Sequence, residues 1–233
     1  MSDKFIFDEI DGEFKFIGDF EGFYKSVGDP WGQSSLSDDK QMDEFYLRSR
    51  SNLLKRLKLI KPIINRTEPI IEIGCGLGYV VNLISSNLDI NVIGLDISET
   101  AIEKAKSLFP NNQFIVHDIS KEKKSFATPS VVILSNILWY ILEDIETISK
   151  NIINLFHPSN SYPMVIIQNA FFKGNQRYGK SICDGFEGAI KLFHLNFKKL
   201  GLEIEQIESF LDENDKMKYD DGIIIFSLKK IAR

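Results

Sequence analysis

Short apolar runs alternate with segments of helical periodicity over most of the chain. A short apolar run bounded by glycine or polar residues is typical of a buried strand, and apolar residues spaced three or four apart are typical of a helix. On this basis the predicted strands are residues 69–73, 91–96, 113–117, 131–134 and 164–167, and the predicted helices between and after them are 79–87, 98–108, 141–155 and 186–200. Strands that alternate with helices favour a parallel, doubly wound sheet.

The last two predicted strands differ from the others because no helix lies between them. Residues 202–209 and 223–228 are both predicted as strands, and the segment between them is acidic and polar. We therefore expect them to form an antiparallel hairpin. The predicted fold class is α/β, a doubly wound seven-stranded, mostly parallel, Rossmann-like sheet with a C-terminal antiparallel β-hairpin. A plain Rossmann fold of the oxidoreductase type is the alternative.

The N-terminal residues lack a clear period. Residues 1–37 are rich in Phe, Gly and Asp, and we interpret them as an irregular arm or lid. A helix is predicted to begin near Asp38, where acidic residues suit its positive end, and to stop before Pro62. The predicted organisation is an arm, 1–37, followed by one domain, 38–233.

Composition excludes several classes of partner. The chain has 33 acidic and 28 basic residues and a net charge of −5, so nonspecific binding to nucleic acid or an anionic membrane is not expected. Cys75 and Cys183 are far apart, which predicts neither a disulfide framework nor a metal site and favours a cytoplasmic protein. No apolar run approaches the length of a membrane span, and the first residues lack a signal-peptide pattern.

A glycine-rich segment follows the first predicted strand of the domain. It reads Glu-Ile-Gly-Cys-Gly-Leu-Gly over residues 72–78 and leads into a predicted helix. Glycines at such a position let the backbone approach a ligand closely. The spacing is G-x-G-x-G with an acid two residues before the first glycine, and Tyr79 stands where a dinucleotide fingerprint has its third glycine. This disfavours a nicotinamide cofactor.

These residues resemble the first motif of the class I S-adenosylmethionine-dependent methyltransferases, and three further motifs follow in the order of that family: residues 95–98, 117–119 and 135–141. The resemblance implies that S-adenosyl-L-methionine is the cofactor. It also implies that Asp96 accepts hydrogen bonds from both ribose hydroxyls, and that Asp118 and the backbone of Ile119 meet the adenine. The cofactor-binding residues expected from the motifs are Glu72, Gly74, Cys75 (through its backbone), Gly76, Gly78, Asp96, Ile97, Asp118, Ile119 and Ser135.

The arm carries a second, looser resemblance. Asp-Pro-Trp-Gly at 29–32, followed by Tyr46 and Arg50, is similar to an arrangement in nodulation-type N-methyltransferases of amino sugars. The resemblance implies that Trp31 and Tyr46 close over the cofactor and that Arg50 pairs with its methionine carboxylate. The alternative is that Trp31 only packs the arm onto the core and that Arg50 is a solvated helix residue.

The acceptor side is predicted from the ends of the later strands, since open α/β sheets place their sites there. Tyr140, after the fourth predicted strand, and His194, in the last predicted helix, are the candidate catalytic groups if the acceptor needs a base. Segment 171–180 is basic and aromatic. The expected acceptor-binding residues are Asn136, Arg177, Tyr178 and Lys180.

Taken together, the sequence predicts an enzyme that transfers a methyl group to the oxygen or nitrogen of a small polar metabolite, with a sugar, amino-sugar or nucleotide-sugar derivative as the favoured acceptor. The alternatives are a non-catalytic S-adenosylmethionine-binding module and a methyltransferase that acts on a protein. A nucleic-acid substrate is disfavoured, because the fourth motif reads Ser-Asn-Ile-Leu instead of Asn/Asp-Pro-Pro-Tyr. Neither a nucleic-acid nor a membrane partner is expected, and a homodimer is compatible with the sequence.

Overall fold

The computed structural model describes residues 4–11, 13–34, 39–62, 67–121, 126–160, 162–174, 176, 178–212 and 218–230. The chain divides into two compact units, Met1–Asp118 and Ile119–Arg233. We describe each unit by itself.

The first unit combines the arm with the first three strands of the main sheet. Its elements are β1 (Phe7–Ile10), β2 (Glu13–Phe16), α1 (Phe20–Val27), α2 (Asp39–Ser49), α3 (Ser51–Ile60), β3 (Ile70–Ile73), α4 (Tyr79–Leu88), β4 (Val92–Asp96), α5 (Glu99–Leu108) and β5 (Gln113–Val116). β4 pairs in parallel with β3 on one side and with β5 on the other. All residues of β3 and β4 are buried, which explains why both segments are continuous apolar runs with little alternation.

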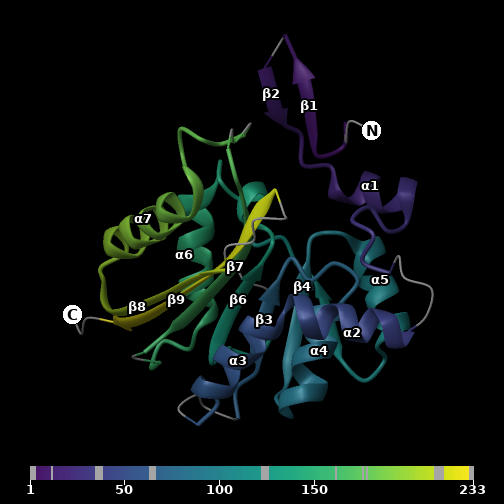
Figure 1. Ribbon diagram of the computed structural model, residues 1–233. Coiled ribbons are helices and arrows are strands. Elements are labelled where there is room, and N and C mark those ends of the chain that lie inside the picture. The colour runs from purple at the N-terminus through teal and green to yellow at the C-terminus, as the bar shows by residue number, and fades with distance from the viewer. Residues whose placement is uncertain are drawn as a thin grey trace. The chain divides into compact units, whose positions relative to one another are not determined.

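The second unit supplies the other four strands of the sheet. Its elements are β6 (Val131–Ser135), the 3-10 turn η1 (Leu138–Tyr140), α6 (Ile145–Leu155), β7 (Met164–Phe172), α7 (Gly185–Lys199), β8 (Leu202–Asp212) and β9 (Tyr219–Lys230). β6 and β7 are parallel, β9 is antiparallel to β7, and β8 is antiparallel to β9. Within this unit α7 packs on β8 and beside α6 (Figure 1).

The predicted fold class is confirmed. The strand order is β5-β4-β3-β6-β7-β9-β8, in a mostly parallel seven-stranded sheet whose last two strands form the expected antiparallel hairpin. Gly201 ends α7 with a φ of 74°, a left-handed conformation that glycine adopts without strain. None of the helices in the described ranges combines the length and apolar character that a membrane crossing requires.

The arm is more regular than its composition suggests. β1 and β2 form an antiparallel hairpin, and α1 follows after a turn at Gly18 (Figure 1). Stacked phenylalanines hold the hairpin, with the rings of Phe7 and Phe14 5.2 Å apart. Each strand has only four residues, too few for the alternation of Phe14 and Phe16 to form a clear pattern, so pattern analysis missed these strands.

The predicted helix between Asp38 and Pro62 is in fact two helices. Arg50 separates α2 from α3 with φ −113° and ψ 14°, which are not helical values. Ser49, Ser51 and Asn52 surround it, and such side chains compete with the helix for backbone hydrogen bonds. The break places Arg50 at the start of α3, half-buried in the first unit.

The arm is fixed to the start of α5 by one carboxylate. Glu21 of α1 accepts hydrogen bonds from the hydroxyl of Ser98 at 2.6 Å, from the backbone N–H of Thr100 at 3.1 Å and from the Thr100 hydroxyl at 2.8 Å. Lys104 of α5 also donates to the carbonyl of Gly28. α1 therefore lies beside α5 (Figure 1).

We predict that this attachment is sensitive to acid. Desolvation raises the pKa of Glu21, but the hydrogen bonds from Ser98, Thr100 and Lys25 outweigh it and lower the pKa from 4.5 to about 2. A lowered pKa means that the attachment is fully stabilising above pH 4.5 and is lost as the pH falls towards 2. Trp31 emission, recorded in a Trp139→Phe background, should change over that range. Glu21→Gln should show the change already at pH 7, whereas Glu103→Gln, on an exposed face of α5, should behave as wild type; identical titrations of all three proteins would contradict the assignment.

Candidate functional site

The glycine loop joins β3 to α4 and depends on left-handed backbone. Gly74, Gly76 and Gly78 have φ values of 74°, 53° and 82°. The N–H groups of Gly74 and Cys75 donate to the carbonyl of Leu95 at 2.7 and 3.0 Å, so the loop turns directly over the end of β4. A side chain at any of the three glycines would be strained, which is why the G-x-G-x-G spacing is required here.

Asp96 at the end of β4 connects the loop to α5. One carboxylate oxygen accepts from the N–H of Gly76 at 2.8 Å, and the other accepts from the N–H of Ser98 at 2.9 Å. Burial raises the pKa of Asp96, and hydrogen bonds from Ser98, Gly76 and Ile97 oppose that rise. A carboxylate has about four lone-pair sites, so with these three backbone donors in place capacity remains for one further donor such as a hydroxyl group.

Glu72 lies within β3, two residues before the loop, and is completely enclosed. Its exposed fraction is 1%, and its Oε2 atom has no hydrogen-bond partner among the described residues. Burial raises the pKa of Glu72 to about 8; the positive charge of Arg50 opposes this, and the charge of Asp96 adds to it. An unpartnered buried carboxyl group is costly in the free protein and suits a ligand that brings a cation or a donor.

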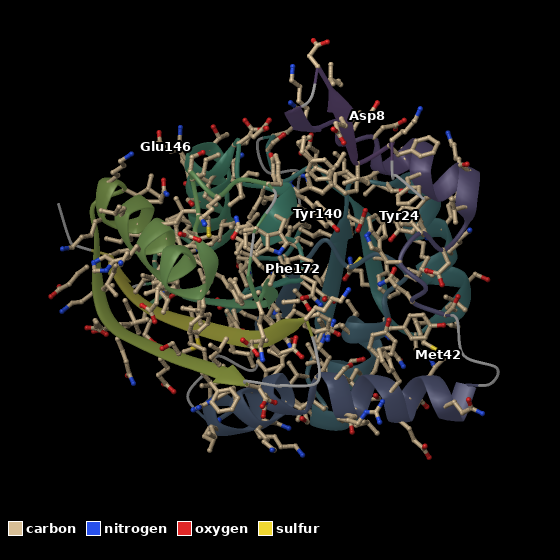
Figure 2. All side chains as sticks on the ribbon, turned by 45° about the horizontal axis from the view of Figure 1, so that its top comes forward. Asp8, Tyr24, Met42, Tyr140, Glu146 and Phe172 are labelled. Atoms are coloured by element: carbon tan, nitrogen blue, oxygen red, sulfur yellow. The ribbon has the colours of Figure 1, made fainter. Side chains whose placement is uncertain are left out.

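Two arm residues that sequence reasoning missed lie on the glycine loop. The Oε1 atom of Gln33 accepts from the N–H of Leu77 and from the hydroxyl of Tyr24, both at 3.2 Å. A Cβ atom built on Gly76 would lie 2.5 Å from Gln33 Oε1 and 2.7 Å from the Tyr24 hydroxyl. Tyr24 comes from α1 (Figure 2) and is buried with Leu77 and Ala101. The only sequence signal for Gln33 was its position directly after the Asp-Pro-Trp-Gly segment.

The other arm residues occupy defined places. Trp31 packs against the rings of Phe20, Phe23 and Tyr24, with centroid distances between 5.3 and 6.2 Å, yet is 40% exposed. Tyr46 is buried, lies parallel to Tyr79 at 4.8 Å and donates to the backbone carbonyl of Gln33. These ring contacts of Trp31 lie within the arm, and its exposed part is compatible with the expected contact to the cofactor.

The remaining residues of the first unit fall into two groups. Ile97 is 46% exposed and Asp118 is half-buried, so both side chains remain accessible beyond β4 and β5. The Cys75 side chain is instead buried beneath the loop, where a Cβ on Gly94 would lie 2.8 Å from its sulfur. Burial raises the pKa of the Cys75 thiol, which agrees with a role for its backbone only.

The second unit gathers its candidate residues around the ends of β6 and β7. Ile119 is buried, and its carbonyl accepts from Asn151 at 2.9 Å. Ser135 is buried at the end of β6, and its hydroxyl has no hydrogen-bond partner in the described part of the chain. Asn136 adopts a left-handed conformation with φ 58°, and its Oδ1 atom accepts from the N–H of Ala170 at 3.1 Å. Its side chain therefore has a structural task that pattern analysis did not indicate.

The two proposed catalytic groups differ in placement. Tyr140 is half-buried in η1, directly after β6, as expected (Figure 2). His194 is the tenth residue of α7, so it lies roughly 13 Å along the helix axis from Gly185. Tyr140 has the better geometric support, and His194 stays a prediction.

The basic loop after β7 is held by its own polar groups. Gln176 donates to the carbonyls of Tyr178 and Cys183, each at 2.7 Å, and the Tyr178 hydroxyl donates to Glu143 at 2.8 Å. Lys180 is exposed, whereas Lys173 pairs with Asp220 at 3.0 Å. Arg177 lies outside the described residues.

Comparison with known proteins identifies the central segment. The family described as "Methyltransferase domain" matches residues 70–171, which include β3, the glycine loop, β4 and β6. The matched residues make up less than half of the chain. The resemblance of the motifs to class I methyltransferases is thereby confirmed for this segment.

One relative shares sequence with part of the chain. It is a protein of Invertebrate iridescent virus 6 named "Putative methyltransferase 235L", 41% identical over 93 residues, or 40% of this chain and 32% of the viral protein. The aligned part of the chain thus spans about a third of the length of that curated relative.

Solved structures share the fold of the methyltransferase domain. Magnesium protoporphyrin IX methyltransferase from Synechocystis PCC 6803, solved with bound S-adenosylmethionine, has a TM-score of 0.57 and 15% identity, covering 89% of this chain and 94% of its own. The N-methyltransferase NodS from Bradyrhizobium japonicum WM9 has a TM-score of 0.56 and 16% identity, covering 84% and 100%. At these identities the likeness concerns the fold alone.

The contact between the arm and the glycine loop predicts that a side chain at position 76 lowers the stability of the protein. Gly76→Ala should destabilise the protein by more than the roughly 1–2 kcal/mol that left-handed backbone costs a residue other than glycine, because the new Cβ also meets Gln33 and Tyr24. Gly201→Ala is the matched control, since its φ is 74° and a Cβ there has nothing within 4 Å. Urea unfolding measures both free energies of unfolding. A Gly76→Ala/Gln33→Ala double variant should recover part of the loss; strictly additive effects would show that Gln33 does not lie over Gly76.

Proposed function

We propose that this chain binds S-adenosyl-L-methionine in its first unit and transfers the methyl group to a small polar acceptor. The observation that carries the proposal is the glycine loop tied to Asp96, beside the enclosed carboxyl group of Glu72, whose Oε2 atom has no hydrogen-bond partner among the described residues. These residues fit the cofactor: the loop permits close approach, Asp96 has acceptor capacity left for a ribose hydroxyl, and Glu72 suits the amino-acid ammonium group. The position of Asp118 after β5 agrees with the assignment of this residue to the adenine.

The chemistry asks little of the protein beyond alignment. When bound, the cofactor supplies an electrophilic methyl group on a sulfonium whose leaving group is a neutral thioether. The residues of the chain then have to hold the acceptor in line and exclude water. Trp31 and Tyr46 of the arm are proposed to cover the cofactor, and Arg50 to pair with its carboxylate.

The acceptor is proposed to be a sugar, amino-sugar or nucleotide-sugar derivative that is methylated on oxygen or nitrogen. Three features support this: the Asp-Pro-Trp segment of the arm, the exposed cation of Lys180 beside Tyr178, and the fold shared with NodS, which is named as an N-methyltransferase. Tyr140 is proposed to line the methyl-transfer point and to orient the attacking oxygen or nitrogen through a hydrogen bond with its hydroxyl group. Asn136, Arg177, Tyr178 and Lys180 are proposed to orient the acceptor.

The first test measures whether the cofactor product binds and how many protons are released on binding. At pH 7 Glu72 of the free protein is mostly protonated, because its pKa is raised to about 8. A bound ammonium group favours the carboxylate, so binding of S-adenosylhomocysteine should release a proton. Calorimetry in two buffers of different ionisation enthalpy measures this release.

Glu72→Gln should abolish the proton release, whereas Glu103→Gln should leave it at the wild-type value. NAD should not bind any of the three proteins. Proton release that persists in Glu72→Gln would assign the effect to another group, and NAD binding without S-adenosylhomocysteine binding would refute the proposed cofactor.

The second test concerns the acceptor. Free and nucleotide-linked amino sugars, incubated with the protein and S-adenosylmethionine, should gain the mass of one methyl group. Arg177→Ala/Lys180→Ala should raise the KM for the methylated acceptor about tenfold or more with little change in the KM for S-adenosylmethionine, because only acceptor binding loses charge-assisted contacts. Lys173→Ala is the matched control in the same loop, since that cation is already paired with Asp220. Equal KM values in the double variant and the control would exclude the basic loop from acceptor binding.

A further inference from the structure

We infer that Gln33 of the arm binds the carboxylate of the cofactor through its side-chain amide nitrogen. The inference rests on the proposed function and assigns a residue that neither the glycine loop nor the later motifs contain. It follows from the orientation of the Gln33 amide, from its place over Gly76 and from the order of the strands in the first unit.

The orientation of the amide is determined by its partners. The backbone N–H of Leu77 can only donate, so the Gln33 atom that faces it at 3.2 Å must be the oxygen. The Tyr24 hydroxyl lies 3.2 Å from the same oxygen, and burial raises the pKa of Tyr24, so the phenol stays protonated and donates. Both contacts use Oε1, and Nε2 therefore points elsewhere with two hydrogens.

The amide nitrogen lies over the second glycine of the loop. A Cβ atom built on Gly76 would be 2.9 Å from Gln33 Nε2. No acceptor for Nε2 is recorded among the residues that the structure describes, and Gln33 is only half-buried, so a ligand can reach it. Two donor hydrogens are thus presented at the point where the absence of a side chain lets a ligand approach the backbone.

The main chain of Gln33 is held on both sides. Its N–H donates to Asp29 Oδ1 at 2.7 Å, and its carbonyl accepts from the Tyr46 hydroxyl at 3.2 Å. Tyr46 in turn lies parallel to Tyr79 at the start of α4. The amide is therefore positioned before any ligand binds, which lowers the entropy cost of the contact.

The strand order indicates which end of the cofactor meets Gln33. The three strands run β5-β4-β3, and their carboxyl ends carry Asp118, Asp96 and the loop after Glu72. If Asp118 takes the adenine and Asp96 the ribose, the amino-acid end lies over β3 and the glycine loop. There Glu72 matches the ammonium group, and Arg50 together with the Nε2 donors of Gln33 matches the carboxylate.

Gln33→Glu tests this assignment with a nearly isosteric change. The glutamate keeps an oxygen for Leu77 and Tyr24 but replaces the donor by a second acceptor, which repels a carboxylate. The probes are S-adenosylhomocysteine and its analogue that lacks only the carboxylate, and calorimetry gives Kd for both. Gln33→Met is the second variant, because it removes the donor without adding a charge.

In both variants the Kd for S-adenosylhomocysteine should rise about tenfold or more, while the Kd for the decarboxylated analogue should not rise. Glu21→Gln, which loosens the arm at its other attachment, should affect both ligands by the same factor. An equal rise for both ligands in the Gln33 variants, or no rise for either, would overturn the inference. If the wild-type protein bound neither ligand, the proposed function itself would fail together with it.

Discussion

The carboxylate of Asp96 is the interaction on which the first unit depends. It accepts from the N–H groups of Gly76 and Ser98, and so joins the glycine loop to the start of α5 inside a buried site. Hydrogen bonds to a charged group contribute roughly 1.5–3 kcal/mol each, and a lost acceptor would leave two buried N–H donors unsatisfied. The connection continues, because the Ser98 hydroxyl caps α5 at Ala101 and donates to Glu21 of the arm. One chain of hydrogen bonds therefore runs from the loop through Asp96 and Ser98 to α1.

The electrostatics of this site favour a cationic ligand. Glu72 and Asp96 are both buried, the charge of Asp96 raises the pKa of Glu72, and the cation of Arg50 opposes this effect. Such a pair is unfavourable in the free protein, since desolvation is not fully compensated. A ligand that carries a sulfonium and an ammonium group would relieve this cost, and a dinucleotide with a pyrophosphate would increase it. A Rossmann-like fold is compatible with S-adenosylmethionine and with a nicotinamide dinucleotide. Burial of the two acids favours the first over the second.

Sequence reasoning succeeded where a chemical requirement is local. The buried strands are continuous apolar runs, and the G-x-G-x-G spacing matches the three positive φ values of the loop. It failed where the determinant is a contact that the sequence pattern does not contain: the β1–β2 hairpin brings aromatic rings together, and Gln33 is placed by contacts with Tyr46 and with Leu77, 44 positions away. The division of one predicted helix at Arg50 is a third case, because a few serines within a helical pattern decide it. The motifs therefore located the glycine loop and Asp96, whereas the arm residues that contact the loop could be identified only from the structure.

Two side chains after β6 already make hydrogen bonds within the second unit, and these bonds limit how the same side chains can bind an acceptor. Asn136 adopts left-handed backbone, which costs a residue other than glycine energy, and its Oδ1 atom accepts from Ala170 at 3.1 Å. That bond occupies one of the two lone pairs of Oδ1, so the amide nitrogen and one acceptor site of Asn136 remain for a ligand. Trp139 is committed as well, since its indole N–H donates to the carbonyl of Ala170. Asn136, which was expected to bind the acceptor, and Trp139 thus first stabilise the segment after β6 that contains Tyr140.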